Sequence, residues 1–211
     1  MTMKPISSVI STSPRVQHSK TSIVATDSGA TTELSGTQKE QAVTRLLEVS
    51  DPAVVDKNLV SSVESITRYK VNARETCRYP ESGFVVTLHG FDIKADSIED
   101  VDKCIKAVMH SQVPMPYDMI RERLAILATL VIKPSGEAEE DVDIRMKSLA
   151  TKLGEFPADI VSYAIQQVER TQKFWPSFAE FYTHISWRLK KREYLMRDLY
   201  QLRLDLTASL Q

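Results

Sequence analysis

Residues that could perform chemistry are few and widely spaced in this chain of 211 residues. Zinc sites need histidine and cysteine ligands at short, fixed spacings such as HExxH or CxxC, and neither pattern occurs. The six glycines are scattered, and no GK[ST] phosphate loop is present. We therefore predict no metal and no cofactor. The histidines and cysteines are His18, His89, His110, His184, Cys77 and Cys104.

Two weaker catalytic patterns also favour structural explanations. Acidic residues gather between Glu137 and Asp143, but they crowd the start of one predicted helix, where the backbone dipole favours negative charge. A metal-dependent nuclease needs carboxylates that converge from separate elements. A cysteine paired with His89 or His110 could form a nucleophile and base, but no spacing supports it. We predict two reduced thiols, of which one or both are buried, no catalytic residue and no enzymatic activity.

The last predicted helix carries a run of basic residues interleaved with Trp187, Tyr194 and Tyr200. Lysine and arginine can neutralise phosphates, and aromatic rings can stack on unpaired bases. A solvated helix face is the alternative explanation for such a run. The candidate nucleic-acid-binding residues are Arg188, Lys190, Lys191, Arg192 and Arg197.

Two apolar groups are candidates for binding a partner protein. Phe174, Trp175 and Phe178 surround Pro176 at a predicted helix start, where they could anchor a partner or pack into the core. The second group is a leucine stripe on the same helix. Because the apolar pattern runs for nearly thirty residues, we expect its distal half to leave the core and to need a partner or another copy. The stripe comprises Leu195, Leu199 and Leu202.

The elements that must position these residues are mostly helical. Apolar side chains recur at helical spacing in several segments between residues 37 and 186. Helix starts are predicted at the capping box Thr37–Glu40, at Asp51-Pro52, at Asp96 and Ser97, and at the capping box Ser177–Glu180, and Gly154 suits a left-handed helix end.

Residues 84–93 are the exception, because they are rich in residues that favour β structure. They predict either a short hairpin around His89-Gly90 or a strand that pairs with another chain. The predicted fold class is therefore mainly α, a compact multi-helix domain with this β element and a long C-terminal helix.

Domain organisation follows from composition. Residues 1–36 are rich in Ser and Thr and lack an apolar period, which predicts a disordered tail. Residues 37–186 form the predicted helical domain, which could divide near 114–116, and 187–211 form a basic, leucine-striped helical arm. The formal net charge of −1 gives no general attraction to nucleic acid or membrane, and no apolar run is long enough to cross a bilayer. With only two cysteines, a cytoplasmic location is expected.

One segment carries a resemblance to known families. Ile165-Gln-Gln-Val-Glu-Arg-Thr-Gln-Lys followed by Phe174-Trp-Pro-Ser-Phe-Ala-Glu-Phe181 resembles the lambda-type replication P protein and the phage helicase loader/inhibitor proteins. The resemblance implies a non-enzymatic accessory protein of phage DNA replication that loads or inhibits a replicative helicase, with single-stranded DNA nearby. Other hypotheses remain open: an inhibitor of a host complex, a structural component that self-associates through the terminal helix, or an enzyme of unrecognised type.

Overall fold

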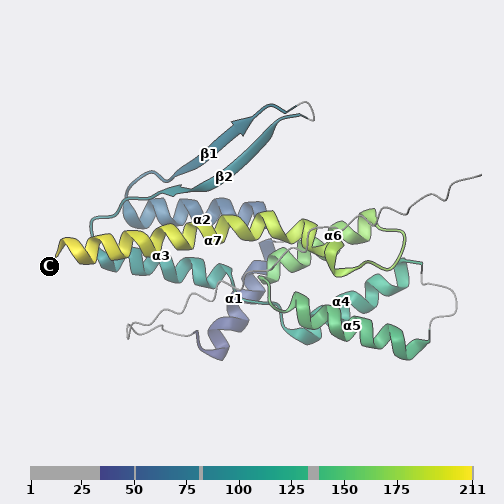
Figure 1. Ribbon diagram of the computed structural model, residues 1–211. Coiled ribbons are helices and arrows are strands. Elements are labelled where there is room, and N and C mark those ends of the chain that lie inside the picture. Colours follow the sequence, from purple (N-terminus) through teal and green to yellow (C-terminus); the bar gives the residue numbers. More distant parts are fainter. Residues whose placement is uncertain (1–33, 50, 81–82, 133–137, 211) are drawn as a thin grey trace, which may run out of the picture. The chain divides into compact units, whose positions relative to one another are not determined.

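The computed structural model describes residues 34–49, 51–80, 83–132 and 138–210 (Figure 1). Within these ranges the chain forms seven helices and one two-stranded antiparallel sheet, which confirms the mainly α class. The predicted tail lies, up to residue 33, outside the described residues. In chain order the elements are α1 (Gly36–Val49), α2 (Pro52–Thr67), β1 (Asn72–Arg78), β2 (Val85–Asp92), α3 (Ile98–Ser111), α4 (Tyr117–Leu130), α5 (Glu139–Leu153), α6 (Ala158–Thr171) and α7 (Phe178–Ser209).

Several helix starts are capped as the sequence predicts. The Asp51 side chain accepts a hydrogen bond from the Ala53 backbone N–H at 2.9 Å, and Pro52 occupies the first turn of α2. Ser97 accepts from the Asp100 N–H at 3.2 Å at the start of α3. These bonds satisfy backbone donors that have no partner within the helix. Local chemistry therefore fixes where α2 and α3 begin.

The predicted cap of α1 is wrong, and Gly154 ends α5 where the sequence predicts but without the predicted left-handed conformation. Ser35 and Gln38 make the reciprocal cap of α1, two residues before the Thr37–Glu40 pair: Ser35 N donates to Gln38 Oε1 at 3.1 Å, and Gln38 N donates to Ser35 Oγ at 3.4 Å. Both pairs have the spacing of a capping box, so spacing alone does not choose between them. Gly154 follows α5 with φ −65°, a right-handed conformation that needs no glycine.

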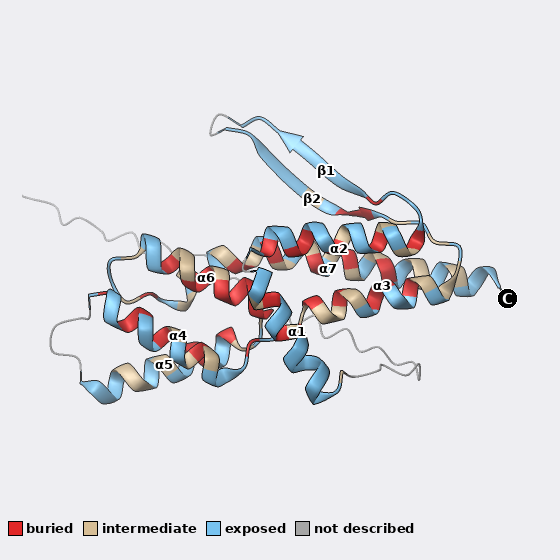
Figure 2. Cartoon of the chain, turned by 180° about the vertical axis from the view of Figure 1, so that it is seen from behind, coloured by how far each residue is buried: buried red, intermediate tan, exposed pale blue. Residues whose placement is uncertain are grey.

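Two clusters of buried side chains make up the core, and α7 contributes to both. The first core cluster joins α1, α4, α5, α6 and the start of α7, and includes Phe181 and Ile185. The second core cluster joins α2, α3, the base of the hairpin and the distal half of α7, and includes Leu195 and Leu199. Figure 2 shows buried residues along α7. Because α7 runs unbroken from Phe178 to Ser209, one helix links the two clusters.

The prediction that the distal half of α7 leaves the core is wrong. Leu199 is fully buried and Leu195 is 2% exposed, while Leu202 is half-buried against the same cluster. Their partners are α2 and α3, which lie more than eighty residues earlier in the chain. The leucine stripe is therefore covered by other helices of the same chain.

The β element is a hairpin, but its turn is not at His89-Gly90. β1 pairs antiparallel with β2, from Asn72 opposite Asp92 to Arg78 opposite Val85, with a register shift after Arg74. Gly90 lies inside β2. The strand Asn72–Arg78 is mostly polar and exposed, so it carries no apolar alternation that would predict it.

Truncating a buried leucine of α7 should destabilise the protein far more than truncating an exposed one. Leu199→Ala should lower the free energy of unfolding by about 2–5 kcal/mol, because it opens a cavity in the second core cluster. Leu204, at 61% exposure on the same helix, is the matched control, and Leu204→Ala should change stability by no more than about 0.5 kcal/mol. Urea unfolding followed by circular dichroism measures both. Equal small effects would show that the distal half of α7 is not packed.

Candidate functional site

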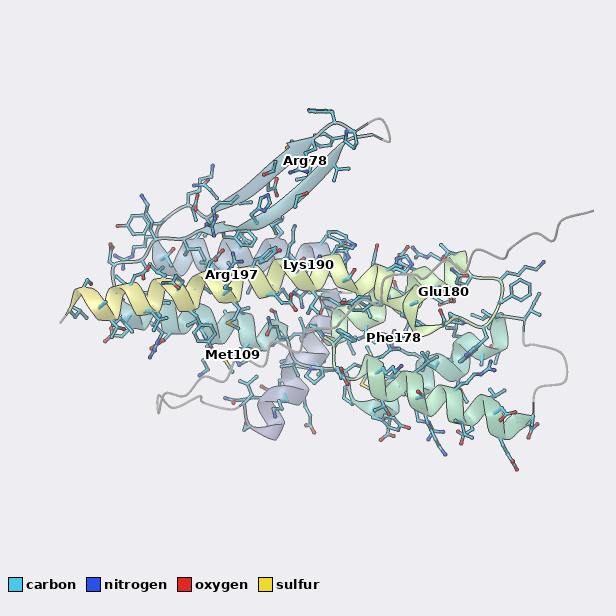
Figure 3. All side chains as sticks on the ribbon, in the orientation of Figure 1. Arg78, Met109, Phe178, Glu180, Lys190 and Arg197 are labelled. Atoms are coloured by element: carbon cyan, nitrogen blue, oxygen red, sulfur yellow. The ribbon has the colours of Figure 1, made fainter. Side chains whose placement is uncertain are left out.

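The predicted aromatic anchors at the start of α7 divide between core and surface. Trp175 and Phe178 are half-buried and pack against the first core cluster. The Phe178 ring stacks near Phe156 at 6.3 Å between centroids and lies 5.8 Å from Tyr182 (Figure 3 labels Phe178). Only Phe174 of the three is largely exposed, at 62%. Of this group, Phe174 is the side chain available to a partner.

The chain fold places Phe174 beside the end of α4. Ile132 N donates to the Lys173 carbonyl at 2.9 Å, and Ile132 and Phe174 form an isolated parallel bridge. Ile126 and Leu130 lie one turn apart on α4, just before Ile132. Exposed fractions are 55% for Ile126, 58% for Leu130 and 48% for Ile132. We call Ile126, Leu130, Ile132 and Phe174 the Phe174 patch.

The α4 members of this patch were missed from the sequence. Helical spacing along α4 selects Ile120, Leu124 and Leu127 as its apolar stripe, and all three are buried. Ile126 and Leu130 fall outside that stripe, one residue before and three after Leu127. Apolar residues off the buried face of a helix are the signal that could have found them.

Arg192 is not a surface residue. Its guanidinium is 1% exposed and pairs with two aspartates from different helices: Nε donates to Asp56 Oδ1 at 2.9 Å, and Nη1 donates to Asp159 Oδ1 at 3.0 Å. A second bond joins Nη2 to Asp159, and Nη1 also donates to the Ser111 carbonyl at the end of α3. Arg192 therefore ties α2, α3 and α6 to α7.

Arg188, one turn earlier, is also withdrawn from solvent. The residue is 6% exposed, and its guanidinium carbon lies 4.2 Å from the ring centroid of Tyr163 and 4.4 Å from that of Trp187. Such stacking is favourable for a guanidinium. Its Nε and Nη1 have no hydrogen-bond partner among the residues described. The prediction that Arg188 and Arg192 form a DNA-contacting surface is wrong, because both groups are buried.

The other three basic candidates keep some exposure. Lys190 is exposed and Lys191 is half-buried. Arg197 is exposed, but its Nη2 donates to the His89 carbonyl at 2.8 Å and its side chain pairs with Asp198 (Figure 3 labels Lys190 and Arg197). Contact of Lys190, Lys191 and Arg197 with nucleic acid stays a prediction.

The Asp56 carboxyl has an altered acidity. Burial raises its pKa above the ordinary 3.8, and the neighbouring Arg192 only partly offsets that effect. The geometry agrees, since Oδ1 accepts from Arg192 while Oδ2 is buried without a partner among the described residues. For Arg192, burial lowers the pKa, but the bonds to Asp159 and Asp56 outweigh it and the pKa is raised. The guanidinium therefore stays charged.

In the described part of the chain, the cysteine and histidine side chains form no nucleophile–base pair. Cys104 is fully buried, and burial raises its pKa to about 11, so its thiol is a poor nucleophile. Cys77 is exposed, and the His89 ring contacts Thr76 Oγ1 at 2.8 Å. No cluster of three His, Cys, Asp or Glu side chains suited to a metal occurs among the described residues. None of the described helices is long and apolar enough to cross a membrane.

Comparison with known proteins returned no protein-family model, no curated protein and no solved structure that matches this chain.

Removing the Arg192 guanidinium should be among the most damaging single changes in the protein. Arg192→Ala should lower the free energy of unfolding by about 3–5 kcal/mol, because Asp56 and Asp159 would remain buried without their counter-ion. Lys190→Ala, two residues away on the exposed face, should cost no more than about 0.5 kcal/mol. Chemical denaturation of both variants checks the difference. A loss below about 1 kcal/mol for Arg192→Ala would contradict the structural role.

The raised pKa of Asp56 gives a pH signature. The folded state binds the Asp56 proton more tightly than the unfolded state, so this group stabilises the fold at low pH and loses that effect as pH rises through its folded pKa. The free energy of unfolding of the wild type, minus that of Asp56→Asn, should therefore increase as pH falls from neutrality toward 3.8. The slope for one proton is at most about 1.4 kcal/mol per pH unit. A difference that shrinks with falling pH would contradict the shift.

Proposed function

We propose that this protein is a non-enzymatic adaptor that binds another protein through the Phe174 patch. The supporting observation is that Ile132 forms a backbone bridge with Phe174, and that Ile126, Leu130 and Ile132, at and just after the end of α4, are like Phe174 each about half exposed or more. Contiguous apolar surface on a soluble domain typically marks an interaction site, and a central aromatic side chain often dominates the binding energy. Trp175 and Phe178, half-buried against the first core cluster, fix the backbone on either side of Pro176 and so hold Phe174 in place.

The proposed partner is a replicative helicase, and the proposed role is loading or inhibition of that helicase in phage DNA replication. The resemblance over residues 165–181 supports this choice, and Phe174 lies within that segment. Binding acts mechanically: the adaptor holds helicase subunits in one arrangement, and no bond is made or broken. The site of action would be the cytoplasm of the host cell. An inhibitor of a different host complex is the alternative partner class.

Contact with single-stranded DNA is a separate part of the proposal. It rests on Lys190, Lys191 and Arg197, since Arg188 and Arg192 are buried. Such contact would weaken steeply as salt rises, because binding releases counter-ions from the phosphates. It would place DNA along α7, at a distance from the Phe174 patch.

Binding to the purified replicative helicase of the host, measured by isothermal titration calorimetry, tests the adaptor proposal. Phe174→Ala should weaken binding by about tenfold or more, as expected for an aromatic anchor whose loss costs over 1 kcal/mol. Leu204→Ala is the matched control, because Leu204 is 61% exposed against 62% for Phe174 and lies about 39 Å beyond Phe178, the first residue of α7. It should bind as the wild type does.

Several outcomes would count against this proposal. Absence of helicase binding by the wild type would remove the helicase as partner. Equal weakening by Phe174→Ala and Leu204→Ala would remove the patch. A concentration-dependent dimer in sedimentation, lost in Phe174→Ala, would instead make the patch a contact between copies of this chain.

A further inference from the structure

The hairpin has one apolar face and one polar face. Side chains alternate between the faces of a strand, and directly opposed residues share a face. One face therefore carries Cys77 with Val86 and Glu75 with Leu88, together with the pair Ala73 and Phe91. The other face is polar apart from Val85 and Gly90, and carries Asn72, Arg74, Thr76, Arg78, Thr87 and Asp92.

The apolar face is turned toward the helices. Ala73 and Phe91 line a groove of about 320 Å³ whose other walls come from α2 and α7. Figures 1 and 2 show the strands separating from α2 toward their turn. Leu88 is half-buried and Val86 is 45% exposed, so the exposure of the apolar face increases from the base of the hairpin toward its turn. We call this space the hairpin groove; its lining is Ala53, Asp56, Lys57, Leu59, Val60, Ser61, Val71, Ala73, Phe91, Lys191, Arg192 and Leu195.

The helical wall of the groove carries unpaired positive charge. Arg192 is neutralised by Asp56 and Asp159. Lys57 and Lys191 also line the groove, and neither forms an ion pair with any residue that the structure describes. Lys191 lies close enough to Asp56 for its charge to oppose the rise in that carboxyl's pKa, so the groove combines apolar surface with two lysines that form no direct ion pair among the described residues.

We propose that the hairpin groove is a docking site for an acidic amphipathic segment of another protein. The apolar side chains of that segment would cover Val86 and Leu88, and its carboxylates would pair with Lys57 and Lys191. An exposed two-stranded hairpin is marginally stable alone, so covering its apolar face also stabilises it. This site is separate from the Phe174 patch, and the proposal does not depend on that of helicase binding.

Two other occupants fit the chemistry less well. The chain's own residues 1–33 contain Lys4, Arg15 and Lys20 against Asp27 and Glu33, so they bring positive charge to a positive wall. Single-stranded nucleic acid would meet the aliphatic Val86 and Leu88 where it needs aromatic rings for stacking.

Peptide selection tests this assignment. A phage-displayed library of random dodecapeptides is panned against the full-length wild type and against the double variant Lys57→Glu/Lys191→Glu. The wild type should enrich sequences that combine apolar residues with Asp and Glu, and the double variant should enrich Lys and Arg in their place. The best wild-type peptide, measured by fluorescence anisotropy, should bind the double variant at least about tenfold more weakly, because like charges would then face each other.

Matched variants on the hairpin localise the peptide. Val86→Asp places a charge on the apolar face and should abolish binding, whereas Thr87→Asp, on the polar face of the same strand, should leave it intact. Melting temperatures of both variants confirm that they fold. The bound peptide should also slow alkylation of Cys77 by iodoacetamide several-fold. Cys104 does not interfere, since it is buried and its pKa is raised to about 11.

The proposal is overturned by any of four results. The first is no enrichment of acidic sequences, and the second is the same enrichment on the wild type and the double variant. The third is loss of peptide binding in Phe174→Ala but not in Val86→Asp. The fourth is binding of a dT20 oligonucleotide that Val86→Asp and the double variant both abolish. The third result assigns the peptide to the Phe174 patch, and the fourth makes the groove a nucleic-acid site. Helicase binding by the Phe174 patch is unaffected by any of them.

Discussion

The buried ion pairs of Arg192 are the interaction on which the arrangement of the helices depends. One guanidinium binds carboxylates of α2 and α6 and a carbonyl at the end of α3, and it does so from α7, where the first core cluster gives way to the second. A buried charge is tolerated only when its partners are in place, so these four segments can meet in few ways. Apolar packing alone is less selective, since it is non-directional.

The network also explains why the basic helix is not a simple cationic surface. Arg188 and Arg192 lie one turn apart on the buried face of α7, and two aspartates compensate the charge of Arg192. The basic residues of α7 that remain accessible to solvent are Lys190, Lys191 and Arg197, and Arg197 forms an ion pair with Asp198. The exposed apolar residues, and not the arginines, set this protein apart from an ordinary helical domain.

Features that depend on neighbouring residues were predictable from the sequence, and features that depend on distant ones were not. Asp51 and Ser97 cap their helices by accepting hydrogen bonds from residues two and three positions later, so the local sequence is enough to predict both caps. Leu199 is buried by helices far away in the chain, and an amphipathic pattern does not tell an internal partner from an external one. Arg192 looks like any arginine on a charged helix, because Asp56 and Asp159 lie 136 and 33 residues away. The sequence alone indicated Phe174 as a candidate, but the exposed residues at the end of α4 could be associated with it only once the structure was known.

The sharing of α7 between both core clusters has a consequence for biosynthesis. Neither cluster is complete until α7 is available, since Phe181 and Ile185 close the first and Leu195 and Leu199 close the second. Chains grow from the N-terminus at about 5–20 residues per second, and many proteins fold one part at a time as they emerge. The helices of residues 36–171 therefore keep exposed apolar faces on the nascent chain until α7 has left the ribosome. Chaperones that shield apolar surface on nascent chains would have to cover these faces in the interval.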